Sequence, residues 1–459
     1  MVSRAREAAA PLYLFLCLLL GGSVQGVWTN MLLQLLGIGL LAWAALARTS
    51  GPLDRSQKQL VAIILLGLAI TLLQLVPLPP SVWERLGGRA PIADGFRLLG
   101  IALPWQPLSL APYDTLATMF VLIPPLALVA ATWRIGTRNS WLVMALLVGT
   151  LAGILLGALQ VSSPGSDNSR WYPYPFSNFG VATGFFANAN HMAILLVISL
   201  PFLTALLASV RGGKRNVQRE SAAIAMVVGA ALVIFVGIAL NGSLAGYGLA
   251  VPVAIASALL LVPRNSAARL WVAIASGALL VVAVGALALS PVGGTGFRSS
   301  ATTSVQSRQE MMKTSAAAAA DFMPFGSGVG TFERVYQLYE DHDRFDVTAV
   351  VNHAHDDYLE LALETGIPGL LVLLLFFVWW LRSSLRAWAA PDADPYARAA
   401  VIASAAILIH SLVDFPLRTA AISTCFALCL ALLVQQRRAP ATAAKDGSTL
   451  WPTRHVVLG

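Results

Sequence analysis

The stretch HAHDDYLELALETGIPGLLVLLLFFVWW, residues His353–Trp380, joins a segment crowded with titratable side chains to a long apolar run. The apolar part, Ile367–Trp380, is typical of a membrane-spanning helix, and Gly366, Pro368 and Gly369 predict a kink where it begins. Chemistry on a lipid-linked substrate that faces water would require such a junction, because the polar reactive groups must lie at the edge of the bilayer.

The rest of the chain is mostly apolar as well. Of its 459 residues, 57% are hydrophobic and only 11% are charged, against roughly 25% charged in an ordinary soluble domain. A folded core cannot absorb this much apolar surface, so lipid must cover part of it, and we expect an all-α polytopic membrane protein. Because a span needs ~20 apolar residues, the sequence predicts twelve spans, near Pro11–Trp28, Met31–Ala47, Gln59–Leu78, Thr115–Thr132, Trp141–Gln160, His191–Val210, Ala222–Leu240, Leu244–Val262, Leu270–Leu289, Ile367–Trp380, Ala400–Phe415 and Ala420–Val434.

The distribution of Lys and Arg predicts the orientation in the membrane. With the N-terminus inside and twelve spans, most of the basic residues fall on the cytoplasmic side, so both termini are expected there. The net charge of +8 then reflects membrane insertion and does not indicate nucleic acid as a partner. No convincing small-residue cleavage site follows the first run, which we interpret as an uncleaved span.

The spans and polar segments divide the chain into four parts. These are spans one to nine in residues 1–289, an outer loop in residues 290–363, spans ten to twelve in residues 364–435, and a disordered cytoplasmic tail in residues 436–459. Helix-forming residues predict that the loop is partly helical over Ser299–Phe322, until the glycines of Pro324–Gly330 interrupt it. The three cysteines fall inside predicted spans and show neither a disulfide framework nor a zinc spacing.

His355 is the first candidate for catalysis. Imidazole, with an ordinary pKa of about 6.5, is suited to accepting a proton at neutral pH. Nearby carboxylates, Asp357 and Glu364 among them, are expected to orient it, and a helix starting at His355 would place Tyr358 one turn further on. An alternative explains the sequence equally well: His353 and His355 are solvated loop residues beside capping aspartates.

Arginines in the outer segments are candidates for binding phosphate. Arg298 and Arg308 lie early in the long loop, and Arg170 lies in an earlier outer segment. The planar guanidinium donates two parallel hydrogen bonds to phosphate and keeps its charge. For any one of them, an exposed residue on an amphipathic helix is the simpler explanation. Two or three together would hold a diphosphate at the membrane surface.

Two further polar groups stand at the ends of predicted spans. Asn188, Asn190 and His191 open the sixth span, where a helix N-terminus favours anions, although capping alone explains Asn190. His410 and Asp414 lie one turn apart at the end of the eleventh span. Ionisable groups within spans are candidates for function, but for this pair we favour a structural role that braces two helices.

Four motifs follow one another along the chain: TGFFANANHMA at Thr183–Ala193, PFGSGVGTF at Pro324–Phe332, HAHDDYLELALETGIPG at His353–Gly369, and HSLVDFPLR at His410–Arg418. Together they resemble the O-antigen ligase and polymerase superfamily over about residues 180–420. Members of that superfamily are polytopic proteins of the bacterial inner membrane that act on undecaprenyl-diphosphate-linked glycans.

The resemblance implies a membrane fold like that of the glycosyltransferase C type, in which the large loop covers a cavity between spans. It also implies transfer without a metal or another cofactor. By position, His355 matches the family's loop histidine, proposed to activate the acceptor hydroxyl, and Arg308 matches the loop arginine thought to steady the diphosphate. Two departures stand out. Asp356 follows the histidine where many members have Asn, and Leu244 stands where many have an arginine after a serine.

The function implied is transfer of a glycan from an undecaprenyl-diphosphate carrier to a sugar hydroxyl at the periplasmic face of the inner membrane. His355 would take the proton, Arg308 with Arg170 or Arg298 would stabilise the departing diphosphate, and Asp357 with Tyr358 would orient the histidine or the acceptor. The partners expected are the lipid-linked oligosaccharide or polysaccharide, a glycan or lipid A–core acceptor, membrane lipids and polysaccharide assembly proteins.

Two other classes of protein stay open. Twelve spans with both termini inside also describe many secondary transporters, whose binding groups usually lie near the middle of the membrane. A non-catalytic component of polysaccharide export would have the same composition. The crowding of polar residues at the outer edge and the length of the loop over residues 290–363 favour an enzyme.

Overall fold

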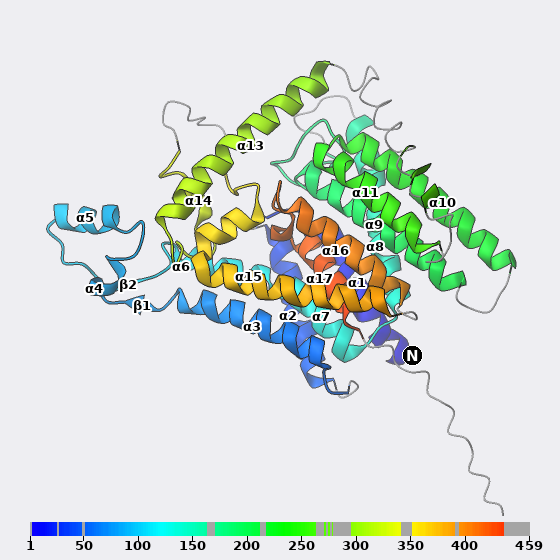
Figure 1. The fold of residues 1–459 in the computed structure, drawn as a ribbon, viewed down its shortest axis with the longest axis horizontal. Coiled ribbons are helices and arrows are strands. Elements are labelled where there is room, and N and C mark those ends of the chain that lie inside the picture. Colours follow the sequence, from blue (N-terminus) through cyan, green and yellow to red (C-terminus); the bar gives the residue numbers. More distant parts are fainter. Residues whose placement is uncertain are drawn as a thin grey trace, which may run out of the picture.

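The computed structural model describes residues 2–24, 27–47, 51–162, 170–211, 217–262, 270, 271, 274, 275, 278, 295–340, 351–390 and 394–435. For residues 2, 3 and 295–307 only the backbone is described. Helices dominate this part of the chain (Figure 1). They are α1 (Val2–Leu20), α2 (Trp28–Leu46), α3 (Arg55–Leu73), α4 (Pro80–Trp83), α5 (Ala90–Leu98), α6 (Pro112–Val121), α7 (Ile123–Ala130), α8 (Asn139–Ser162), α9 (Ala189–Arg211), α10 (Val217–Asn241), α11 (Leu244–Leu260), α13 (Thr295–Asp321), α14 (Phe332–Tyr336), α15 (Asp357–Ala389), α16 (Pro395–His410) and α17 (Ala420–Leu433).

Short elements complete the described chain. Strands β1 (Pro77–Leu78) and β2 (Gln106–Pro107) pair antiparallel at the base of a small arm that carries α4 and α5. A π-helical turn, Ala131–Ile135, follows α7, and a 3₁₀ turn, η4 (Pro416–Arg418), lies between α16 and α17. In Figure 1 the arm projects at the left, beyond the end of α3.

The apolar runs predicted from the sequence are mostly helical where the structure describes them, but several helices end earlier than predicted: the third run reaches Leu78, whereas α3 ends at Leu73 and Leu78 lies in β1. Seven helical segments in the described ranges are long and apolar enough to cross a membrane, and α11, α16 and α17 are shorter apolar helices. This confirms an all-α polytopic membrane protein. The predicted run Leu270–Leu289 falls almost wholly outside the described residues.

The first helix does not coincide with the first predicted apolar run. Helix α1 begins at Val2 and ends at Leu20, whereas the apolar run suggested Pro11–Trp28. The helix ends there because Gly21 and Gly22 pass tightly between neighbours: a Cβ on Gly22 would lie 2.0 Å from the carbonyl oxygen of Phe185. Close packing, which hydropathy does not report, therefore determines where this helix ends.

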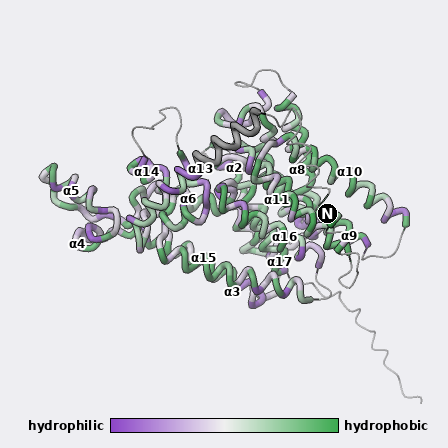
Figure 2. The backbone as a smooth tube through the Cα atoms, turned by 45° about the horizontal axis from the view of Figure 1, so that its top comes forward, coloured by the Kyte–Doolittle hydropathy of each residue, from purple (hydrophilic) through white to green (hydrophobic). Residues whose placement is uncertain are grey.

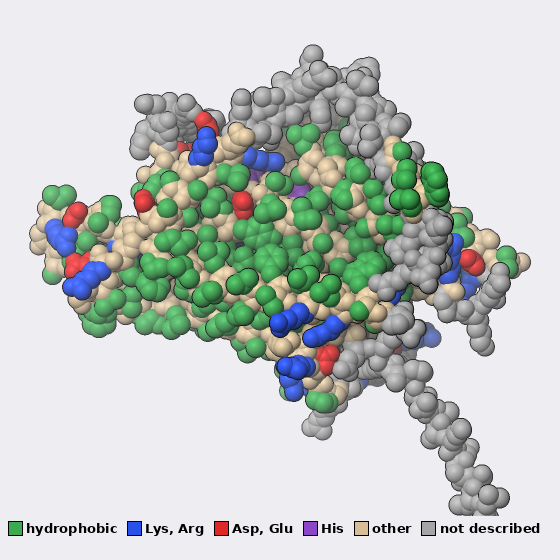
Figure 3. All heavy atoms as spheres, viewed as in Figure 1, with side chains coloured by type: hydrophobic (Ala, Val, Ile, Leu, Met, Phe, Trp, Pro, Cys, Tyr) green, Lys and Arg blue, Asp and Glu red, His purple; other side chains and the backbone are tan. Residues whose placement is uncertain are grey.

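The helices pack around α9, the most buried of the candidate spans. It contacts α8, α10, α11 and α16, while α3 and α15 run side by side along another edge of the molecule (Figure 1). Figure 2 shows hydrophobic residues along most of these helices and hydrophilic ones on the arm and near α14. On the face shown in Figure 3, hydrophobic side chains cover a broad band, with Lys and Arg near its margins. Lipid is the solvent that such a surface suits.

A turn of the chain after α13 docks against the first part of α15. The backbone N–H groups of Ser327 and Gly328 donate to the carbonyls of Leu363 and Glu364, both at 2.9 Å. The predicted kink is confirmed at Gly366, which has φ 57° and ψ −150° inside α15. A Cβ at Gly366 would lie 2.2 Å from the carbonyl oxygen of Pro324, so only glycine lets this turn approach the helix.

Replacing Gly366 by alanine is therefore expected to destabilise the protein. The backbone conformation alone costs an alanine about 1–3 kcal/mol, and the contact with Pro324 adds to it. Thermal unfolding in detergent would measure the loss. Gly67→Ala is the matched control, because the nearest atom to a Cβ there is a side-chain carbon of Val372 at 3.9 Å. Equal melting temperatures for the two variants would contradict the prediction.

Candidate functional site

A buried carboxylate, Asp414, gathers polar side chains from three distant parts of the chain. It lies in the turn between α16 and α17 and has no exposed surface. Its Oδ1 lies 3.4 Å from Nδ1 of His355 and 3.7 Å from Nε2 of His191. Its Oδ2 lies 3.7 Å from Nη2 of Arg308 and accepts a hydrogen bond from the side-chain amide of Asn190. Four candidate side chains from three separate segments thus meet at Asp414.

The elements that carry these side chains explain how they meet. Arg308 lies in the middle of α13, and Asn190 and His191 lie in the first turn of α9. Asn188 caps that helix: its Oδ1 accepts from the N–H of Asn190 at 2.8 Å. Capping was the simpler explanation for Asn190, but the residue that caps α9 is Asn188. The side chain of Asn190 donates to Asp414 instead.

Asp414 remains ionised at neutral pH because its neighbours outweigh its burial. Burial raises the pKa of the Asp414 carboxyl, but the adjoining imidazoles of His191 and His355 lower it well below its ordinary value. A buried carboxylate in such a setting fixes the histidine that faces it. The Nδ1 of His355 faces Asp414 at 3.4 Å, which leaves Nε2 as the ring nitrogen directed away from the carboxylate.

His355 and Arg308 are reachable from outside, whereas Asp414 is not. Both side chains are 23% exposed. The 3.7 Å separation of Arg308 from Asp414 exceeds a direct hydrogen bond, so the guanidinium retains donors for an anion. The arrangement can therefore offer a base and a cation side by side to a ligand.

His355 itself has an unusual backbone conformation. Its φ is 52°, in the left-handed region that non-glycine residues seldom adopt. Helix α15 does not start at His355, because Asp356 caps it by accepting from the N–H groups of Tyr358 and Leu359 at 2.9 and 3.0 Å. Asn and Asp are equally good caps, so Asp356 in place of Asn preserves this role.

Tyr358 and Asp357 do not take the positions expected of them. The Tyr358 hydroxyl donates to the carbonyl oxygen of Leu408 at 2.7 Å, so it is directed toward α16. Asp357, with Glu360 and Glu364, faces Arg418 at 3.3–3.4 Å instead of orienting His355. The three carboxylates lie on one face of α15 because they are spaced three and four residues apart.

The sequence reasoning missed three residues near the site, although two signals pointed to them. Glu360 completes the i, i+3, i+7 acidic pattern of α15, and Arg418 closes the motif that contains Asp414. The third, Phe415, contacts the rings of His353, His355 and His191 with centroids 4.5, 4.8 and 5.0 Å away. It packs the histidines around Asp414.

His353 packs on Phe415 but pairs with a carboxylate other than Asp414. Its Nδ1 is 2.8 Å from Oε1 of Glu360, which links it to the acidic face of α15. His353 therefore connects the two charged groups: the one around Asp414 and the one around Arg418.

The remaining arginine candidates are placed differently. The guanidinium of Arg170 lies over the ring of Trp171 at 5.2 Å from its centroid. Arg298 lies in the first turns of α13, where only the backbone is described. Leu244 begins α11, and the preceding Ser243 donates from Oγ to Oδ1 of Asn190 at 2.7 Å. Leu244, where many family members have arginine, therefore directly follows a serine that is hydrogen-bonded to Asn190, a partner of Asp414.

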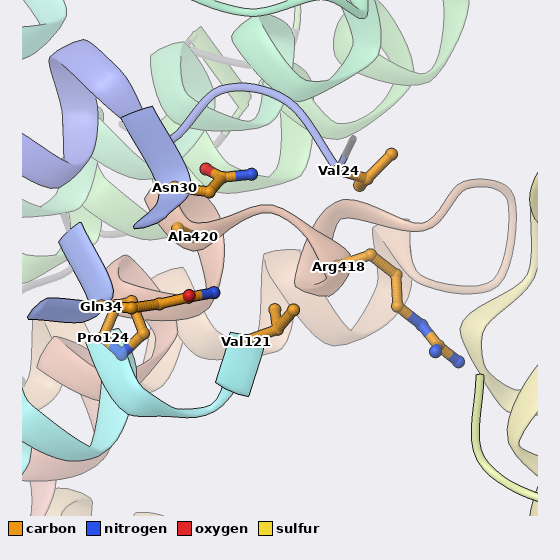
Figure 4. Close-up of a pocket in the computed structure, with 7 residues that line it drawn as sticks. All are labelled: Val24, Asn30, Gln34, Val121, Pro124, Arg418 and Ala420. Carbon is orange, nitrogen blue, oxygen red and sulfur yellow. The ribbon is translucent and has the colours of Figure 1, made fainter. Parts of the chain in front are cut away.

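A small pocket lies beside Arg418 and not over Asp414. Figure 4 shows its lining, in which the guanidinium of Arg418 points away from Asn30 and Gln34. The lining residues are Val24, Asn30, Gln34, Val121, Pro124, Arg418 and Ala420. Among the residues that the structure describes, no group of three His, Cys, Asp or Glu is arranged to hold a metal.

Comparison with known proteins identifies one family. Residues 229–374 match the family model described as O-antigen ligase. The matched segment contains Arg308 and His355 and ends before Asp414. No curated protein shows a significant match to the chain.

Proposed function

This chain is a member of the O-antigen ligase and polymerase superfamily, and from that premise we propose that it transfers a glycan from an undecaprenyl-diphosphate carrier to a sugar hydroxyl. The reaction would take place at the periplasmic face of the bacterial inner membrane and without a metal. The observation that carries the proposal is the convergence of Arg308 and His355 on the two oxygens of Asp414.

In the proposed reaction His355 Nε2 accepts the proton of the attacking sugar hydroxyl. The oxygen of that hydroxyl bonds to the anomeric carbon of the donor, and the bond from that carbon to the diphosphate breaks. Arg308 stabilises the charge that develops on the departing lipid diphosphate, a role that gains strength where water is scarce. Asp414 stays ionised and holds His355, as a carboxylate does in a catalytic dyad.

The proposed topology has twelve spans, both termini in the cytoplasm and a glycosyltransferase C-like arrangement. Residues 1–289 would hold nine spans, residues 290–363 the periplasmic loop and residues 364–435 the last three spans, with residues 436–459 as a cytoplasmic tail. Two observations support it: the helices that overlap the described apolar runs, and the packing of α13, which carries Arg308, against α15, which His355 precedes by two residues.

Arg308→Lys is expected to reduce glycan transfer strongly. Lysine keeps the positive charge but loses the two parallel donors that fit a phosphate, so this substitution is not conservative. Membranes that contain the variant would be assayed for transfer from a lipid-linked donor. Arg334→Lys is the matched control, because Arg334 lies on the same outer segment, is 66% exposed and pairs with Asp114 away from the site. Normal transfer by Arg308→Lys and Arg308→Ala would remove the phosphate role.

Deletion of the gene and analysis of surface and lipid-linked glycans would test the function and identify the acceptor. Long unattached lipid-linked chains would indicate a ligase, and single repeats attached in place of long chains would indicate a polymerase. Substrate uptake into proteoliposomes that persists in His355→Ala would instead support a transporter. A deletion phenotype that both His355→Ala and Arg308→Ala rescue would support a non-catalytic export component.

A further inference from the structure

The carboxylate of Glu360 holds the two residues that precede His355. Its Oε1 lies 2.8 Å from Nδ1 of His353, and its Oε2 accepts a hydrogen bond from the N–H of Ala354 at 2.9 Å. Glu360 is only 1% exposed and is itself held by Arg418, 3.3 Å away. Both of its oxygens are therefore engaged by the same short segment.

These contacts fall where the backbone most needs support. A left-handed conformation such as that of His355, with φ 52°, is unfavourable for a residue with a side chain. Such a conformation persists only where surrounding contacts impose it. The bonds from Glu360 fix the segment on one side of His355, and the cap from Asp356 fixes the other.

A second route leads from Glu360 to the imidazole itself. The His353 ring, bonded to Glu360, packs on Phe415 with centroids 4.5 Å apart. Phe415 in turn contacts the ring of His355 at 4.8 Å and follows Asp414 in the chain. Backbone and ring contacts from Glu360 thus reach the same imidazole.

We propose that Glu360 is a positioning residue for His355, one that acts through the His353–Ala354 segment and not by touching substrate. This inference rests on the proposed function, since it requires His355 to be the base. Neutralising the charge of Arg418 is a different role, because Asp357 and Glu364 also contribute to it. Of the three carboxylates, Glu360 is the one whose described hydrogen bonds reach the segment before His355.

The test compares two identical chemical changes one helical turn apart. Glu360→Gln replaces one acceptor oxygen by an NH₂ group, so the side chain can no longer accept from both His353 and Ala354. Glu364→Gln removes the same charge beside Arg418, but its remaining carbonyl oxygen can still accept from the N–H of Gly330. Steady-state transfer would be measured for both variants in membranes.

Glu360→Gln is expected to lower kcat by up to ~10²-fold, the effect of a displacement of about 1 Å at a catalytic group. KM for the lipid-linked donor should change little, because Arg308 is untouched. Glu364→Gln should lose clearly less. Equal losses in the two variants, or a loss confined to KM, would overturn the inference.

A double variant separates positioning from general damage to the fold. In a His355→Ala background, Glu360→Gln should cause no further loss of the residual activity, because residues that act as a unit are not additive. An additive loss would overturn the proposal. If Glu360→Gln does not accumulate, His353→Phe provides the same test, since it keeps a ring on Phe415 and removes the bond to Glu360.

The outcomes also separate the inference from the function on which it rests. If wild-type membranes transfer no glycan, or His355→Ala transfers normally, the proposed function fails. If the wild type transfers, His355→Ala does not, and Glu360→Gln behaves like Glu364→Gln, only the positioning role fails.

Discussion

Replacement of His355 by alanine is expected to lower glycan transfer by about 10²–10⁴-fold, the contribution of a well-placed general base. Alanine removes the Nε2 that would accept the hydroxyl proton, while Asp414 keeps His191, Asn190 and Arg308 as partners. The variant should therefore still accumulate in the membrane. Transfer from lipid-linked donor, normalised to the amount of protein, is the measurement.

Both the thermal stability and the abundance of His355→Ala must be measured, so that a loss of transfer can be distinguished from a loss of folded protein. Alanine carries a Cβ as histidine does, so His355→Ala leaves the cost of the left-handed φ almost unchanged, and it is not expected to lower the melting temperature by more than Gly366→Ala does. Full transfer by a stable His355→Ala protein would remove the proposed base. If His355→Ala lowers both transfer and the amount of protein, the variant does not test the base. Arg308→Lys then tests the site instead, because it leaves the histidine in place.

Arg418→Met is expected to destabilise the protein by about 3–5 kcal/mol, as breaking a buried ion pair does. Asp357, Glu360 and Glu364 are at most 9% exposed, and Arg418 lies within 3.4 Å of each. Methionine fills a similar volume but leaves three carboxylates without their cation. Thermal unfolding in detergent would measure the change.

The defect of Arg418→Met should shrink as the pH is lowered. Protons taken up by the carboxylates remove the charges that Arg418 balanced, so the variant gains stability relative to the wild type toward acid pH. Arg386→Met, at the exposed last turn of α15, is the matched control and should show neither effect. A melting temperature of Arg418→Met equal to that of Arg386→Met would contradict the prediction.

The sequence predicted that most of the described apolar runs form helices, because hydropathy indicates which segments can cross a membrane, but it did not predict where each helix begins and ends. It also identified Arg308, His355, His191, Asn190 and Asp414 as candidates, from four separate segments of the chain. It could not predict that Asp414 is the carboxylate that faces His355, since they are far apart in the chain and only the packing of α13, α15 and α16 brings them together. A structural brace between helices is the interpretation that the sequence favours for Asp414, and its described contacts include the candidate base and cation as well as Asn190 and His191 of α9.

Nearness in sequence misled the assignment of the carboxylates beside His355. Asp357 and Glu364 were expected to orient it, but the cap at Asp356 starts α15 at Asp357 and fixes which face each later residue occupies. That face meets Arg418, and Tyr358 is carried round toward Leu408. A helix start displaced by two residues thus redirects the side chains that follow.

Helix α13 holds Arg308 far along the chain from its contact with the turn that docks on α15. Its far end is fixed where Phe322 packs with Phe332 and Leu363, next to the turn that Glu364 holds. Arg308 lies 13 residues before Asp321, which at 1.5 Å per residue is ~20 Å along the helix. A tilt of about 3° would therefore carry the guanidinium through ~1 Å, enough on its own to change turnover by ~10²-fold. Substitutions at Phe322 or Phe332, where α13 packs beside this turn, would then alter catalysis without touching any reacting atom.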